Sequence, residues 1–250
     1  MRCKTVFIYL SILSVLFIGC GQNIEYGKQP LVLDDFDFNL DLDRFFKDET
    51  IFGGNNKAGY SVSSEEYRFE ADSLMKGVIQ YSTNSTSTSR TLATFAGVRF
   101  ESLGLLTDWD DKHVLLVCAE TAHARAKDIK KIVDELVKEF GEDIQLSQED
   151  WFGSSNTILT FQKGARIAKL SVYLKEPLSV INNEPDHNSF FSENEEKKEK
   201  RFHAKEILPL MTAGEPEDTE LKCNVFYVKE VADKAIAQLE SRSGFMTAYK

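Results

Sequence analysis

Histidine, carboxylate and serine side chains are the residues of this chain that could perform hydrolytic chemistry. The four histidines, His113, His123, His187 and His203, share no spacing typical of metal ligands. His113 follows Asp110 and Asp111, so an imidazole and a carboxylate could combine with a serine hydroxyl in a triad. However, the sequence contains no Gly-x-Ser-x-Gly turn to hold a nucleophile. We therefore assign no catalytic residue and expect a protein that is not an enzyme, with a hydrolase as an alternative.

Residues 35–43 carry a strict alternation of apolar and acidic side chains. Phe36, Phe38, Leu40 and Leu42 alternate with Asp35, Asp37, Asn39, Asp41 and Asp43. A period of two predicts a half-buried strand with one apolar and one acidic face. Alternate carboxylates on a strand lie about 6.5–7 Å apart, too far for two of them to chelate one calcium ion unaided.

The acidic face therefore leaves three interpretations open. It is a solubilising edge that repels other strands, a surface for a basic partner that includes Asp37 and Asp41, or a cation site completed by a neighbouring element. The first interpretation is favoured, so no residue is assigned as a metal ligand and no cofactor is expected.

Two tryptophans, Trp109 and Trp151, are candidate contact residues for a partner. Trp109 lies within an acidic turn, and Trp151 follows Glu149-Asp150. Tryptophan is enriched at the centres of protein interfaces, and its ring also stacks on sugars. If these rings are exposed, they would support binding of a protein or a carbohydrate. If they are buried, they would belong to the core, and this is the favoured interpretation for Trp151.

Cys118 and Cys223 each lie in an apolar run that is typical of a strand. In an oxidising compartment they either form a disulfide across a long loop or remain buried free thiols, and the sequence favours neither. The chain has 40 acidic and 30 basic residues and a formal net charge of −10. This acidity excludes a nucleic-acid partner, because such binding depends on Lys and Arg contacts to phosphate.

The N-terminus has the pattern of an export signal. Arg2 and Lys4 precede an apolar run, residues 6–18, which is shorter than the roughly 20 residues that cross a bilayer. Residues 17–20, Phe-Ile-Gly-Cys, resemble the lipobox of bacterial lipoproteins, with Phe17 where leucine is usual. The alternative is an ordinary secretory signal cleaved near Gly19.

The lipobox resemblance implies that residues 1–19 are removed and that acyl chains on Cys20 attach the mature chain to a lipid bilayer. Gly21 stands where an aspartate favours retention in the inner membrane of some bacteria. The resemblance therefore implies a lipid-anchored protein of the bacterial cell envelope, on the outer membrane rather than the inner one.

The remaining patterns predict the elements that position these residues. Short strand-like runs fill residues 59–120 and 156–174, and another spans 221–228. An apolar stripe at 3.6-residue spacing predicts a long amphipathic helix at about 122–140, capped by Thr121 and ended by Gly141. A second helix is expected at about 230–242. Strands in runs with few helices predict an α+β fold with a mainly antiparallel sheet.

The expected organisation has three parts. A signal peptide, 1–19, precedes the lipidated cysteine and a spacer, 20–33, and a single globular domain, 34–250, carries a polar loop at about 182–201. An acidic, membrane-anchored body without a catalytic pattern favours a module that binds a protein partner. A module that binds a carbohydrate or another small ligand, and a hydrolase, are the alternatives.

Overall fold

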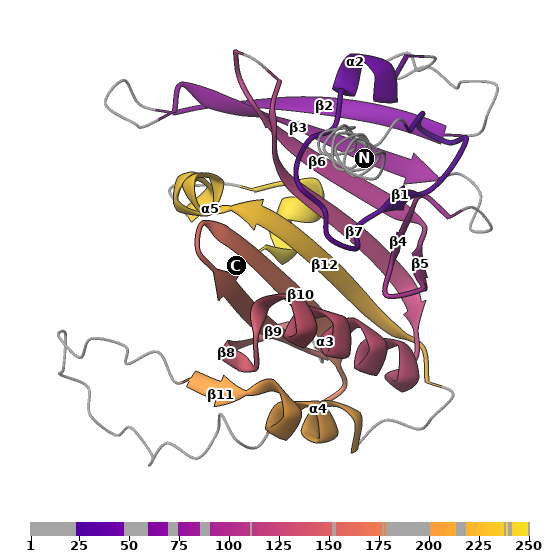
Figure 1. The fold of residues 1–250 in the computed structure, drawn as a ribbon, viewed down its shortest axis with the longest axis vertical. Helices are drawn as coiled ribbons and strands as arrows, with labels where there is room; N and C mark the ends of the chain where they lie inside the picture. The colour runs from indigo at the N-terminus through magenta and orange to yellow at the C-terminus, as the bar shows by residue number, and fades with distance from the viewer. Residues whose placement is uncertain are drawn as a thin grey trace, which may run out of the picture.

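The fold was obtained as a computed structural model (Figure 1). It describes residues 24–47, 60–69, 75–85, 91–110, 112–151, 154–176, 178, 201–213, 219–237, 239 and 242–249. The strands are β1 (Leu31–Val32), β2 (Tyr60–Arg68), β3 (Gly77–Ser85), β4 (Ala93–Phe95), β5 (Val98–Phe100), β6 (Ser102–Asp108), β7 (Val114–Ala124), β8 (Asp143–Trp151), β9 (Ser154–Lys163), β10 (Arg166–Leu174), β11 (Arg201–His203) and β12 (Leu221–Lys229). The helices are α2 (Leu42–Phe45), α3 (Ala126–Phe140), α4 (Ala204–Ala213) and α5 (Glu230–Ala237), followed by the 3₁₀ turn η1 (Gly244–Ala248).

The described strands form one large sheet and one small sheet. The large sheet has nine strands in the order β11-β8-β9-β10-β12-β7-β6-β3-β2, and every neighbouring pair is antiparallel. The small sheet has the order β1-β4-β5 and contains one parallel pair, β1 with β4. The prediction of an α+β fold dominated by an antiparallel sheet is therefore confirmed.

Both faces of the large sheet are covered, which explains why β7 and β12 read as nearly continuous apolar runs. On one face, α3, α4, the small sheet and the N-terminal segment pack into the larger core. On the opposite face, α5 and the C-terminal turn cover a smaller core around Phe226, Met246 and Tyr249. In Figure 1, α3 and α4 lie side by side against the half of the sheet that contains β8 and β9.

The prediction of a strand over residues 35–43 is wrong, although the predicted burial is right. The apolar residues of this segment are buried and the four aspartates are exposed, in strict alternation. However, Asp35 and Phe38 adopt positive φ angles of 54° and 64°, and α2 begins at Leu42. A strand needs a neighbour that pairs with its backbone, whereas alternating burial needs only a core beneath it.

The helix boundaries also differ from those expected. The long helix begins at Ala126 and not near residue 122, because β7 continues to Ala124 in a ladder with β12. Arg125, not Thr121, is its N-cap. The C-terminal helix ends at Ala237 and not near 242. The helix α4 lies where the sequence analysis placed no core helix, and it includes Pro209.

Cys118 and Cys223 are both buried free thiols, which is the second of the two alternatives that the sequence left open. Cys118 pairs with Phe226 in the smaller core, whereas Cys223 pairs with Thr121 and belongs to the larger core. Neighbouring strands thus present the two thiols to opposite faces of the sheet, so their Cβ vectors point apart.

Several predictions lie outside the described residues. They are the signal peptide, Cys20 with the first part of the spacer, and nearly all of the polar loop at 182–201. Within the described part of the chain, no helix is long and apolar enough to cross a membrane.

Candidate functional site

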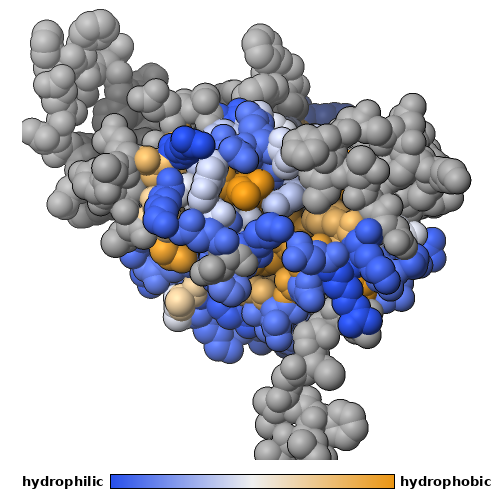
Figure 2. Space-filling model, turned by 90° about the horizontal axis from the view of Figure 1, so that it is seen from above, coloured by the Kyte–Doolittle hydropathy of each residue, from blue (hydrophilic) through white to orange (hydrophobic). Residues whose placement is uncertain are grey.

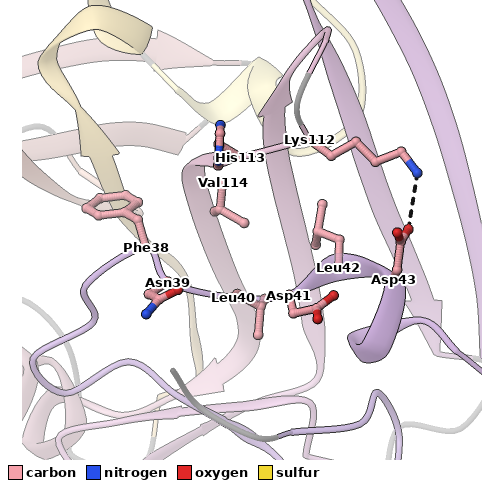
Figure 3. A pocket seen from close by; sticks show the side chains of 9 residues that line it. All are labelled: Phe38, Asn39, Leu40, Asp41, Leu42, Asp43, Lys112, His113 and Val114. Atoms are coloured by element: carbon pink, nitrogen blue, oxygen red, sulfur yellow. Dashed lines mark hydrogen bonds and ion pairs between the residues drawn. The ribbon is translucent and has the colours of Figure 1, made fainter. Parts of the chain in front are cut away.

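A hollow of about 270 Å³ brings together two segments that are far apart in the sequence (Figure 3). Residues 38–43 form one side, and the start of β7 with the turn before it forms the other. Four of the lining side chains are apolar and buried: Phe38, Leu40, Leu42 and Val114. The others, Asn39, Asp41, Asp43, Lys112 and His113, are polar and exposed. The site therefore has an apolar floor and a charged rim.

An ion pair links the two sides of the hollow. The Lys112 ammonium lies 3.1 Å from a carboxylate oxygen of Asp43, as the dashed line in Figure 3 shows. This hydrogen bond and the charge of Asp43 raise the pKa of Lys112. Both side chains are more than half exposed, so the pair contributes at most about 1 kcal/mol to stability. The pair fixes the shape of the rim more than it stabilises the fold.

Backbone strain occurs on both sides of the hollow. Phe38 and Lys112 have φ angles of 64° and 54°, a region that bulky L-residues rarely adopt. Such conformations cost about 1–3 kcal/mol each and cluster at functional sites, where the surrounding structure maintains them. Two strained residues that face one hollow make it the leading candidate site among the described residues.

Asp37 and Asp41, predicted to face a partner, are both exposed, and both also accept local backbone hydrogen bonds. A carboxylate oxygen of Asp37 accepts the Asn39 N–H at 2.9 Å, which closes a turn. Asp41 accepts the Arg44 N–H at 3.1 Å and so caps α2. Each carboxylate lies at the surface, and its local hydrogen bond fixes its orientation.

The two histidines considered for a triad lie at opposite ends of β7. His113 precedes the strand and has Nδ1 3.1 Å from an oxygen of Asp108. His123 is near the end of the strand, about 30 Å away at the rise of an extended chain. The Nδ1 of His123 lies 2.8 Å from Glu220, and its Nε2 lies 3.6 Å from Glu101.

His123 is not placed as in a hydrolytic triad. In a triad one ring nitrogen faces a carboxylate and the other faces the nucleophile. Both ring nitrogens of His123 face carboxylates instead. The lining of the hollow beside His113 contains no hydroxyl or thiol side chain among the described residues.

The two tryptophans are not part of this site. Trp109 is half-buried, the Arg68 guanidinium lies 5.0 Å from its ring centre, and a Cβ at Gly77 would lie 3.1 Å from the ring. Trp151 ends β8 opposite Ser154, and its side chain lies outside what the structure describes. Among the described residues, no group of three His, Cys, Asp or Glu side chains could hold a metal ion.

Sequence reasoning missed Lys112, Leu42 and Val114 as parts of one site. Of the lining residues, the sequence analysis had considered Asp41 for a partner surface, because alternation marks it, and His113 for a triad. No protein family, curated protein or solved structure matches this chain.

Proposed function

We propose that this chain is a non-enzymatic lipoprotein of the bacterial cell envelope, anchored through acylated Cys20, whose folded body binds a basic protein partner. The observation that carries the proposal is the hollow with its apolar floor and its acidic surroundings. In this arrangement the partner inserts one anchoring side chain, and its positive charges meet Asp35, Asp37 and Asp41.

The shape of the site suits a side chain with an apolar body and a polar or charged tip. Binding energy at interfaces is concentrated in a few anchors, most often Trp, Tyr or Arg, that fill well-packed pockets. The floor side chains, including Phe38 and Leu42, are less than a tenth exposed, so the hollow is a fixed feature of the core edge. A preformed pocket reduces the entropy lost when a partner binds.

The net charge of the chain supports a mainly electrostatic interface. On the face drawn in Figure 2, most of the coloured residues are hydrophilic, with apolar ones among them. The chain carries a net charge of −10. Charge complementarity of this kind speeds association and makes binding sensitive to salt.

A site-specific crosslink tests the partner. A photo-reactive phenylalanine analogue replaces exposed Asn39 in the native, membrane-attached protein. We expect one discrete adduct with a basic protein. The adduct should not form when the sample is irradiated at about 1 M salt, where the Debye length is about 3 Å. The same analogue at Thr247, which is exposed on the opposite side of the sheet, serves as the control.

A charge-removing variant sharpens this test. Asp37→Asn with Asp41→Asn removes two charges, and asparagine still accepts the turn and cap hydrogen bonds. We expect adduct formation to fall about tenfold, whereas Asp134→Asn with Glu206→Gln, which removes two charges on α3 and α4, leaves it unchanged. Equal adducts from positions 39 and 247, or equal losses in both double variants, would contradict a partner site at the hollow.

The membrane anchor has its own test. Replacement Cys20→Ser removes the thiol that the lipobox resemblance marks for acylation, so the protein should leave the membrane fraction and become soluble. Mass spectrometry of the parent chain should show an acylated N-terminal cysteine. An unmodified N-terminus, or unchanged membrane association of Cys20→Ser, would refute the anchor without affecting the crosslinking result.

A further inference from the structure

The first turn of α3 and the second half of α4 enclose a hollow of about 570 Å³ that is separate from the site described above. The lining residues are Arg125, Ala126, Lys127, Lys130, Leu208, Pro209 and Thr212. This volume lies within the roughly 300–1,000 Å³ typical of sites for small organic ligands.

The two walls of this hollow differ in chemistry. The α4 wall is apolar: Leu208 is half-buried and Pro209 is exposed, and the adjacent Leu210 is 39% exposed. Leu210 is one of the few large apolar side chains exposed among the described residues. Apolar side chains beside a concave surface favour an apolar ligand over water.

The α3 wall is basic, in a chain that carries a net charge of −10. Arg125, Lys127 and Lys130 all lie in or next to the first turn of this 15-residue helix, where the helix dipole also favours an anion. Lys130 is paired with Asp134 at 2.5 Å, and Asp128 accepts the Arg125 N–H at 3.2 Å. An anion at this wall would lie beside Arg125 and Lys127 and would compete with Asp134 for Lys130.

We propose that this hollow binds an anionic amphiphile with a single alkyl chain. Its carboxylate or phosphate head lies at the basic α3 wall, and its chain lies along Leu208 and Pro209. The combination of a basic wall and an apolar wall decides the class: a fully polar anion would make no contact with the apolar side chains of α4, and an uncharged lipid would gain nothing from the positive charge of the α3 wall. This site adds a second binding activity, and it does not depend on the proposed protein partner.

Calorimetric titration with dodecanoate and with dodecyl phosphate tests the proposal, each below its critical micelle concentration. We expect saturable binding of at least one anion at micromolar concentration, with the negative heat-capacity change that apolar burial produces. The tighter of the two ligands shows whether a fatty acid or a phosphate-bearing lipid fits better. Dodecyl maltoside, which has the same alkyl chain without the charge, should bind at least about tenfold more weakly.

Two variants and one control locate the site. Lys127→Glu with Lys130→Glu should weaken anion binding by about tenfold or more, because two attractive charges become repulsive. Thr212→Trp should weaken binding by filling the hollow. Lys138→Glu lies about 12 Å further along the same helix and should change the affinity by less than about twofold.

Three results would overturn the proposal. They are the absence of saturable binding for both anions, equal affinity for dodecyl maltoside, and a loss in Lys138→Glu as large as that in the double variant. Circular dichroism of each variant confirms that it is folded, so that a loss of affinity reports on the site.

Discussion

Two distant parts of the chain supply the carboxylates beside His123. Its Nδ1 lies 2.8 Å from Glu220, which precedes β12, and its Nε2 lies 3.6 Å from Glu101, which precedes β6. The hydrogen bond to Glu220 and the charges of both carboxylates raise the pKa of His123. The imidazolium form is therefore favoured in the folded protein.

We expect an NMR titration to give a pKa for His123 above the ordinary value of about 6.5, and Glu220→Gln to lower it. Because the folded pKa is raised, the stabilisation is complete below about pH 6.5 and is lost as the pH rises through the folded pKa. The side chain is 52% exposed, so solvent screening keeps the effect below about 1 kcal/mol. An unchanged pKa in Glu220→Gln would contradict the assignment.

Gly104 has no side chain, and the ring of Phe245 in the C-terminal turn packs directly against it. It lies in the middle of β6, and a Cβ there would overlap the ring of Phe245. Gly104→Ala should therefore lower the free energy of unfolding by about 1–3 kcal/mol through overpacking. Denaturant unfolding measures this change. Adding Phe245→Ala should make Gly104→Ala nearly neutral, and a loss that persists in that background would exclude the clash.

At the scale of elements, a buried ionic cluster holds the C-terminal segment against the large sheet. The Lys169 side chain, on β10, is only 9% exposed, and its ammonium lies 2.8 Å from Asp233 of α5. Tyr249 donates its hydroxyl to the same carboxylate, and the ammonium lies 4.0 Å from the Tyr249 ring centre. Burial lowers the pKa of Lys169, and the pairing with Asp233 opposes this shift.

Removal of Asp233 should destabilise the fold, because the Lys169 charge then stays buried without this carboxylate. Asp233→Ala leaves Lys169 without its carboxylate and should reduce the free energy of unfolding by about 2–3 kcal/mol, somewhat less than for a fully buried pair. Urea unfolding measures the loss. Combining Asp233→Ala with Lys169→Met should recover part of the stability, because no charge then remains buried. Strict additivity of the two losses would show that the pair is not coupled.

At the scale of the whole molecule, the large sheet separates two cores, and each core contains one thiol. Burial raises the pKa of both Cys118 and Cys223, so neither forms a reactive thiolate near neutral pH. A fold without a disulfide does not depend on the redox state of its compartment.

We therefore expect the mature body, purified without reductant, to show no reaction with a thiol reagent until it is denatured. Two thiols should then react, and the midpoint of unfolding should be the same with and without reductant. A reductant-dependent midpoint, or fewer than two reactive thiols after denaturation, would mean that the sheet does not keep the cysteines apart.

The sequence by itself determined which side chains face the core. Alternation at 35–43 predicted buried Phe36, Phe38 and Leu40 and exposed aspartates, and short apolar runs predicted an antiparallel α+β fold. Burial follows from the local order of apolar and polar residues, because transfer of apolar surface from water depends on the side chain itself.

Only the tertiary structure decided which groups meet. It made residues 35–41 an irregular segment that leads into α2 rather than a strand, placed Glu220 beside His123, and set Cys118 and Cys223 on opposite faces. Long-range hydrogen bonds, ion pairs and pockets form between segments that are far apart in the chain. The local order of residues does not specify which distant segment packs against a given one. The hollow between residues 38–43 and β7 is of this kind, since its two sides are about 70 positions apart in the chain.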